Sequence, residues 1–299
     1  MIPGVGIPMF MGASGLYQFT TFTFTNCSIT GQNGPTLAQM QSAYSATAWT
    51  QNTAFFNIGA YQGYQKWTVP KTGTYRFDIA GASGGKNTYA DPNDYRGLGA
   101  RVQADISLVE GEFIIIAVGQ SGIIQTYSGG GGGATFIVRL STPAALLVAG
   151  GGGGSYLNSD YRVSHSNAST ATSGKTPSGN QTPGGGSGGG GYLGSGANST
   201  SYGSGGGGFN NGLVGGGGYA TYAGAGGFGG GGGGEWNFYG SSGGGGGYSG
   251  GCNGSGGYGG YAGSNANGGG GSYNIGTASN VTLTAAYNSS HGYATITLL

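Results

Sequence analysis

The chain has 299 residues and a formal net charge of +1, and only 6% of its residues are Asp, Glu, Lys or Arg. Disordered proteins usually resist collapse through high net charge and contain few aromatics, whereas 12% of this chain is Phe, Trp or Tyr. After Lys175 there is no Lys or Arg, so the basic residues that neutralise nucleic-acid phosphates or attract anionic membranes are missing. No apolar stretch approaches the roughly 18 residues that span a bilayer. We therefore expect no nucleic-acid partner and no membrane insertion.

Residues 1–16 combine prolines and glycines, which predicts an extended arm that docks on a neighbouring subunit. The arm begins without positive charge, unlike a secretory signal peptide, so we expect a protein made in the cytoplasm and used without an export signal of its own. Cys27 and Cys252 are too few and too far apart for a disulfide framework or a metal site. We expect two separate thiols, no metal and no cofactor.

Residues 17–149 predict a β-sandwich of jelly-roll or similar kind, because short strand patterns follow one another at close spacing. Apolar and polar residues alternate in most of these segments, while 113–118 is apolar on both faces and predicts a central strand. A single short helix is predicted from Leu37 to Trp49, with Thr36 as its N-cap. The predicted strands are 18–25, 64–69, 74–79, 102–108, 113–118, 135–138 and 145–148.

Glycine dominates the next part of the chain, since 60 of the 77 glycines follow Ser128. Residues 150–272 form a glycine-rich insertion whose runs of two to six glycines are broken by single aromatic residues. Strand patterns at 280–284 and 293–298 then indicate that residues 273–299 return to the same sheets. The two ends of the insertion are therefore held in place by the sandwich.

Such an insertion is either a solvated coil or a lattice in which glycine backbone packs on glycine backbone. Collagen is excluded because the glycines are consecutive and the chain has only 8 prolines. A three-residue-per-turn polyglycine II helix has no internal hydrogen bonds, so it is stable only if neighbouring helices pair nearly every N–H and C=O. Contacts free of Cβ atoms make that pairing sterically feasible. We favour the lattice, with the aromatics capping it or filling its seam with the sandwich.

Several stretches resemble the glycine-rich extracellular domain of the anaplastic lymphoma kinase and leukocyte tyrosine kinase receptors. The resemblance implies a TNF-like β-sandwich with an inserted bundle of polyglycine helices. The rest of those receptors has no counterpart here, and Met40 stands where the receptor pattern has a disulfide partner for the position of Cys27, so the receptor function is not carried over. The matching stretches are 24–27, 34–39, 65–75, 80–85, 118–120, 129–136, 146–154, 228–234, 243–251 and 291–293.

In composition, the chain is also similar to adhesins at the tips of certain bacteriophage tail fibres, which use polyglycine helices. Phage particles assemble in the cytosol without export signals or disulfides, and this agrees with the expectations above.

Catalytic patterns are weak in this sequence. Residues 247–251 fit a nucleophile elbow, but that motif needs a preceding strand and a following helix, and a glycine-rich chain produces the pattern by chance. His165 and His291 are expected in loops or turns, and Asp91 and Asp94 in a solvated turn rather than a Ca²⁺ or acid–base pair. We expect no enzyme.

The sequence leads to two functional hypotheses. The first is a non-enzymatic virion structural protein, a tail-fibre, appendage or decoration protein that binds other virion subunits or itself and a host glycan or outer-membrane protein. The second is an extracellular ligand-binding or adhesive module. Aromatics in loops leaving the lattice are the candidate binding residues, with lattice capping as the alternative role. They are Tyr156, Tyr161, Trp236, Phe238 and Tyr239.

Overall fold

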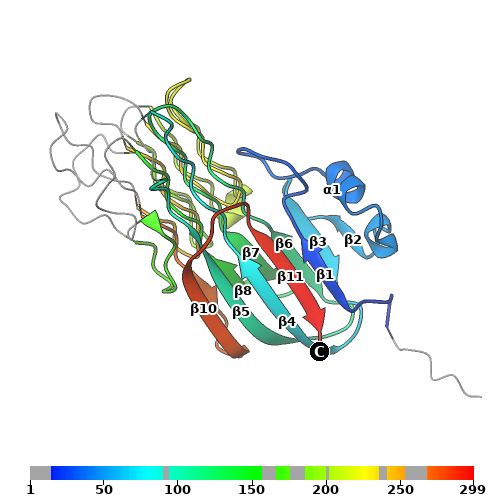
Figure 1. Ribbon diagram of the computed structural model, residues 1–299. Helices are drawn as coiled ribbons and strands as arrows, with labels where there is room; N and C mark the ends of the chain where they lie inside the picture. The colour runs from blue at the N-terminus through cyan, green and yellow to red at the C-terminus, as the bar shows by residue number, and fades with distance from the viewer. Residues whose placement is uncertain are drawn as a thin grey trace, which may run out of the picture.

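Two antiparallel β-sheets pack face to face, and glycine-rich segments extend from one end of this sandwich (Figure 1). The computed structural model describes residues 15–89, 94–156, 166–175, 186–199, 202–235, 241–252 and 268–299. The predicted docking arm at 1–16 therefore lies almost entirely outside the described residues. The expected all-β sandwich is confirmed.

The first sheet has five strands, and the C-terminal strands close it. Its order is β1 (Thr21–Phe24), β11 (Tyr293–Leu298), β4 (Gly73–Ala80), β5 (Gly99–Leu108) and β10 (Ser279–Asn288). Strand β11 pairs with both β1 and β4, so the chain does return from the glycine region to complete the sandwich.

The second sheet has six strands, with β6 and β7 near its centre. Its order is β2 (Phe56–Ile58), β3 (Tyr64–Thr68), β6 (Phe113–Ala117), β7 (Thr135–Arg139), β8 (Ala144–Ala149) and β9 (Tyr273–Asn274). The sequence analysis did not predict β2 or β9. These strands have 3 and 2 residues, too few to show an alternating pattern.

The core between the sheets is aromatic. Trp67, Phe24, Phe56 and Phe77 are fully buried there. Helix α1 (Leu37–Ala43) adds Met40 to this core, and it begins as predicted at Thr36, whose side chain accepts a hydrogen bond from the backbone of Gln39. The helix is shorter than predicted. It ends at Ala43, and a separate 3₁₀ turn (Ala48–Gln51) contains Trp49.

The outer face of the first sheet carries paired charges. Arg76 donates to both carboxylate oxygens of Asp105 at 2.8 Å, and Arg101 pairs with Asp78 across the same two strands. Asn280 of β10 donates a third hydrogen bond to Asp105 at 2.7 Å. The side chain of Asp105 is only 3% exposed, and the hydrogen bonds from Arg76 are the main reason that its pKa is lowered.

The glycine region is a hydrogen-bonded lattice, and residues 128–134 show its rule. Successive backbone N–H groups from Gly129 to Ala134 donate in turn to three neighbouring runs, 152–155, 120–123 and 229–232, and then repeat the same order. The distances lie between 2.8 and 3.2 Å. A donor direction that repeats every third residue is the signature of a helix with three residues per turn.

The carbonyl groups of residues 128–134 follow the same period. They accept in turn from three further runs, 224–227, 243–246 and 82–85. This helix therefore has six hydrogen-bonded neighbours, and each neighbour is also bonded to the next one around the ring. The arrangement is a hexagonal lattice, and it requires glycine. A Cβ on Gly131 would overlap the backbone carbonyl of Gly244, and one on Gly133 would overlap that of Phe228.

The lattice starts before the expected boundary at residue 150. Runs 82–85, 119–123 and 128–134 belong to it, although they lie in the connections between β4 and β5 and between β6 and β7. The prediction assigned these connections to the sandwich because they lie between predicted strands. In the structure, they supply the central helix and two of its neighbours.

We predict that Gly131→Ala destabilises the fold by about 3 kcal/mol or more, because the new Cβ meets rigid backbone rather than a movable side chain. The free energy of unfolding should be measured by denaturant titration. Gly276→Ala is the matched control, since a Cβ there has no atom within 4 Å, and it should change stability by less than about 0.5 kcal/mol. Equal effects of the two substitutions would contradict the lattice.

We predict that Asp105→Asn lowers the thermal unfolding temperature at about pH 7, because the charge-assisted pair with half-exposed Arg76 is lost. The pKa of Asp105 is lowered in the folded state, so its contribution is present above the unfolded value of about 3.9 and is lost as the pH falls through the folded value. Thermal unfolding of the two proteins should therefore differ at about pH 7 and converge as the pH falls through the folded-state pKa of Asp105. A difference that persists at low pH would show that the charge on Asp105 is not the cause.

Candidate binding surface

Aromatic residues gather at the two ends of the lattice. At the end next to the sandwich, they form a packed seam with β3, β6, β7 and β8. Tyr248 stacks on Tyr273 with ring centroids 4.3 Å apart, and Phe228 is completely buried. The predicted filling of the seam by aromatics at the ends of runs is confirmed. The seam residues are Tyr64, Phe136, Tyr192, Phe209, Phe228, Tyr248 and Tyr273.

A second aromatic group lies at the opposite end of the lattice, and we call it the tyrosine ridge. Its members are Tyr89, Tyr127, Tyr222, Tyr219 and Tyr202, in spatial order. The successive ring centroids are 5.2, 6.0, 6.4 and 4.3 Å apart. The rings thus form one continuous row.

The course of the glycine runs places this row far from the sandwich. The run after Tyr127 enters β7, the run after Tyr222 ends at Phe228 in the seam, and the run after Tyr202 ends at Phe209 in the seam. Each ridge tyrosine therefore stands at the outer end of a run whose other end is anchored. Backbone hydrogen bonds tie neighbouring turns together, such as the one from Tyr127 N to Tyr222 O at 3.2 Å.

The ridge is accessible to a partner. Tyr89 is 67% exposed, Tyr202 58% and Tyr222 41%, whereas most large aromatics of the sandwich are buried. A tyrosine ring combines a flat apolar face with a hydroxyl that donates and accepts hydrogen bonds, so such rings suit both sugars and protein surfaces. The ring positions are fixed by the lattice, which limits the entropy lost on binding.

A shallow depression of about 340 Å³ adjoins the ridge at Tyr202. Ser199 accepts hydrogen bonds from the backbone N–H of Tyr202 and of Gly203, at 3.0 and 2.8 Å, and Ser204 accepts one from Gly217 at 2.6 Å. These bonds fix the hydroxyl oxygens in place, and the hydroxyl group of Ser204 can also donate a hydrogen bond. The lining residues are Asn198, Ser199, Tyr202, Gly203, Ser204, Gly217 and Gly218.

Of the five binding residues predicted from the sequence, only Tyr156 lies among the described residues. Tyr156 was expected in an exposed loop, but it is only 9% exposed, and it forms a bridge with Ser128 at the end of the lattice. Burial, together with the nearby charge of Glu235, raises its pKa. Tyr161, Trp236, Phe238 and Tyr239 lie outside the described residues. The sequence analysis missed the ridge because the sequence shows only which aromatics lie at the ends of glycine runs. It does not show whether such an end lies next to the sandwich or at the opposite end of the lattice.

The residues considered above for catalysis or metal binding make ordinary structural contacts where the structure describes them. Half-buried His291 accepts a hydrogen bond at Nδ1 from the backbone N–H of Ser121 at 3.0 Å, and burial lowers its pKa. Asp94 pairs with Arg96 at 3.1 Å, while Asp91 and His165 lie outside the described residues. Ser249, in the elbow-like pattern, lies on a glycine run rather than between a strand and a helix.

Both cysteines are free thiols, as expected. Within the described part of the chain, no group of three or more His, Cys, Asp or Glu side chains is arranged to hold a metal ion. In the same part, no helix combines the length and the apolar character that crossing a bilayer requires.

Comparison with known proteins shows a similarity to part of a receptor. The chain is 34% identical over 119 residues to the mouse (Mus musculus) leukocyte tyrosine kinase receptor. The matched stretch covers 39% of this chain and 12% of the receptor. The chain thus matches only a small part of that receptor's length, and the similarity supports a distant relation to its extracellular domain. No protein-family model matches the chain.

We predict that seam and ridge aromatics differ in their effect on stability. Phe228→Ala should lower the free energy of unfolding by about 3–5 kcal/mol, because it empties a fully buried position. Tyr202→Ala should lower it by about 1 kcal/mol or less, because only one exposed ring pair is lost. Chemical denaturation followed by circular dichroism measures both values. A large loss for Tyr202→Ala would mean that the ridge holds the lattice together.

Proposed function

We propose that this protein is a non-enzymatic adhesive and structural component of a virion surface, as in a phage tail fibre, appendage or decoration protein. The observation that carries the proposal is the tyrosine ridge at the outer end of an uncharged lattice. In this role the lattice is a stiff spacer, and the ridge with its depression contacts the host. The sandwich and the N-terminal arm attach to other virion subunits or to another copy. Nucleic acid and membrane insertion have no part in it.

The uncharged character of the lattice supports this role. Beyond Lys175, the chain has one acidic residue, Glu235, and no basic residue, so long-range electrostatic steering is weak. Contact with the partner then depends on ring stacking and short hydrogen bonds. These are the interactions that an exposed tyrosine row and fixed serine hydroxyls provide. A neutral surface glycan or an aromatic-rich loop of an outer-membrane protein fits this chemistry.

A second function is favoured by the similarity to the receptor. In this alternative, the chain is an extracellular module that binds a protein ligand or adheres to a surface. The genes beside the coding sequence discriminate best, because a fibre or capsid operon supports the virion role. A signal sequence upstream, or glycans on Asn-X-Ser/Thr sites such as Asn198, supports the extracellular module.

We predict that the double substitution Tyr202→Ala with Tyr222→Ala weakens surface binding at least tenfold, since two exposed rings of the row are removed. Binding of the purified full chain should be measured on a bacterial glycan array and on outer-membrane vesicles. Tyr287→Ala is the matched control. Tyr287 is 44% exposed but lies on β10 against Arg101, and its loss should leave binding unchanged. An equal loss in the control, or no binding to either probe, would contradict the proposal.

A further inference from the structure

A second helix of the lattice, residues 187–191, is incompletely surrounded. Its N–H groups follow the period of three seen at 128–134. Gly188 and Gly191 donate to run 194–197, Gly189 donates to run 249–252, and Ser187 and Gly190 donate to run 230–233. All three donor directions are therefore filled.

The acceptor directions of the same helix are not all filled. The carbonyls of Gly188 and Gly191 accept from run 206–209, and those of Ser187 and Gly190 accept from run 244–247. By the same period, the carbonyl of Gly189 should accept from a sixth run. It receives no hydrogen bond from any described residue, although Gly189 is buried. A buried carbonyl without a donor is costly.

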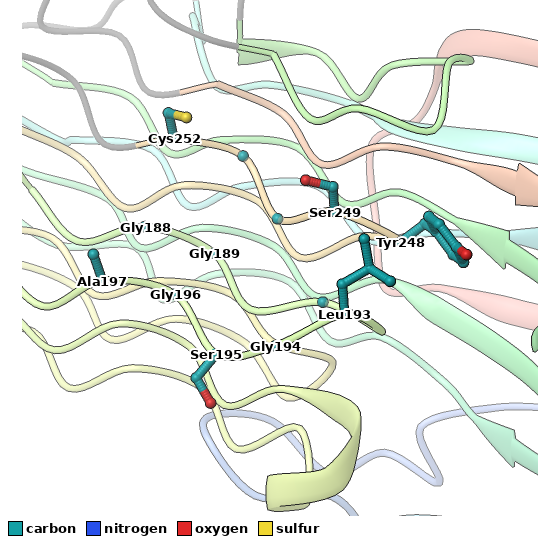
Figure 2. A pocket seen from close by; sticks show the side chains of 13 residues that line it. Gly188, Gly189, Leu193, Gly194, Ser195, Gly196, Ala197, Tyr248, Ser249 and Cys252 are labelled. Atoms are coloured by element: carbon teal, nitrogen blue, oxygen red, sulfur yellow. The ribbon is translucent and has the colours of Figure 1, made fainter. Parts of the chain in front are cut away.

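The bonds among the five neighbours locate the missing sixth. Run 194–197 is bonded to 206–209, which follows it around the ring, and 249–252 is bonded to 244–247 on the other side. No bond joins 194–197 to 249–252 within the described residues. The vacant direction therefore lies between these two runs. A groove of about 360 Å³ occupies this position (Figure 2), and its floor and walls are Gly188, Gly189, Gly191, Leu193, Gly194, Ser195, Gly196, Ala197, Tyr248, Ser249, Gly250, Gly251 and Cys252.

We propose that this groove binds an extended glycine-rich segment of a partner protein, which completes the hexagonal ring as a sixth polyglycine helix. The segment's N–H donates to the carbonyl of Gly189. The backbone N–H groups of Gly194 and Gly250, which form no hydrogen bond with other described residues, take carbonyls of the incoming chain. Recognition is thus by backbone pairing, a hexagonal counterpart of strand addition to a sheet edge.

The groove also selects what enters it. Its lining has no charged side chain, so a charged segment would lose hydration without gaining a partner. At most described glycines of the lattice, an added Cβ would overlap the backbone of a neighbouring run, which favours glycine at the contact. The described glycine runs of this chain are already bonded into its own lattice. Within the described residues, a second copy thus has no unpaired glycine run to offer, and we assign the occupant to a different protein.

The test uses a hexaglycine peptide with a terminal lysine for solubility, and hexaalanine with the same ends as its control. We expect the glycine peptide to shift the amide NMR signals of Gly189, Gly194 and Gly250 in the full chain. The alanine peptide should bind at least tenfold more weakly. Equal binding of the two peptides, or no shift at these amides, would overturn the proposal.

A matched pair of variants separates groove binding from any effect on the fold. A Cβ added at Gly194 or at Gly276 would have no atom within 4 Å, so a side chain can start at either position without displacing the backbone, but only Gly194 lines the groove. Gly194→Leu should abolish the peptide-induced shifts, and Gly276→Leu should leave them unchanged. Sedimentation of the wild type and of Gly194→Leu should show the same oligomeric state at the same concentration. Self-association that Gly194→Leu removes would identify a second copy as the occupant, contrary to the proposal.

Discussion

The structure depends on the fact that glycine has no Cβ. A polyglycine helix with three residues per turn directs its N–H and C=O groups outward, and no bond inside the helix satisfies them. Fixing each residue costs about 1–2 kcal/mol in backbone entropy, whereas a hydrogen bond returns about 0.5–1.5 kcal/mol net. Such a helix is stable only when nearly all of its groups are paired. The closed ring around residues 128–134 meets this condition, and any Cβ at Gly131 or Gly133 would break it.

The sandwich supplies what the lattice lacks, which is fixed ends. Runs leave the sheets after β4, β6 and β8, and returning runs enter β7 or end in the aromatic seam. An anchored run loses less entropy on packing than a free one, because its starting position is already fixed. The core around Trp67 and Phe77 is an ordinary apolar core. The protein thus joins two stabilising principles, apolar burial in the sandwich and saturated backbone pairing in the lattice.

This construction separates stability from recognition. The aromatics at the end of the lattice next to the sandwich are packed in the seam, whereas the tyrosine ridge is exposed and contributes little to packing. Substitutions in the ridge can therefore change a partner without a large effect on the fold. The groove beside residues 187–191 differs from the ridge because it is formed by the lattice backbone, where one neighbouring position is open among the described runs. Both features arise from where the runs begin and end.

The alternating segments and the apolar run at 113–118 were sufficient to predict the sandwich, the short helix and the return of the C-terminal strands. Composition alone predicted that the glycine runs pack together, because a weakly charged, aromatic-rich chain does not remain a coil. The particular neighbours of each run could not be read, since glycine runs are identical and carry no register information. Only the tertiary structure decided that Tyr156 is buried and Tyr202 exposed, and that the lattice begins before residue 150. It also decided that, among the described runs, the ring around residues 187–191 has no sixth neighbour. The physical reason is that backbone pairing between distant runs, rather than any side-chain pattern, determines which residue reaches which end.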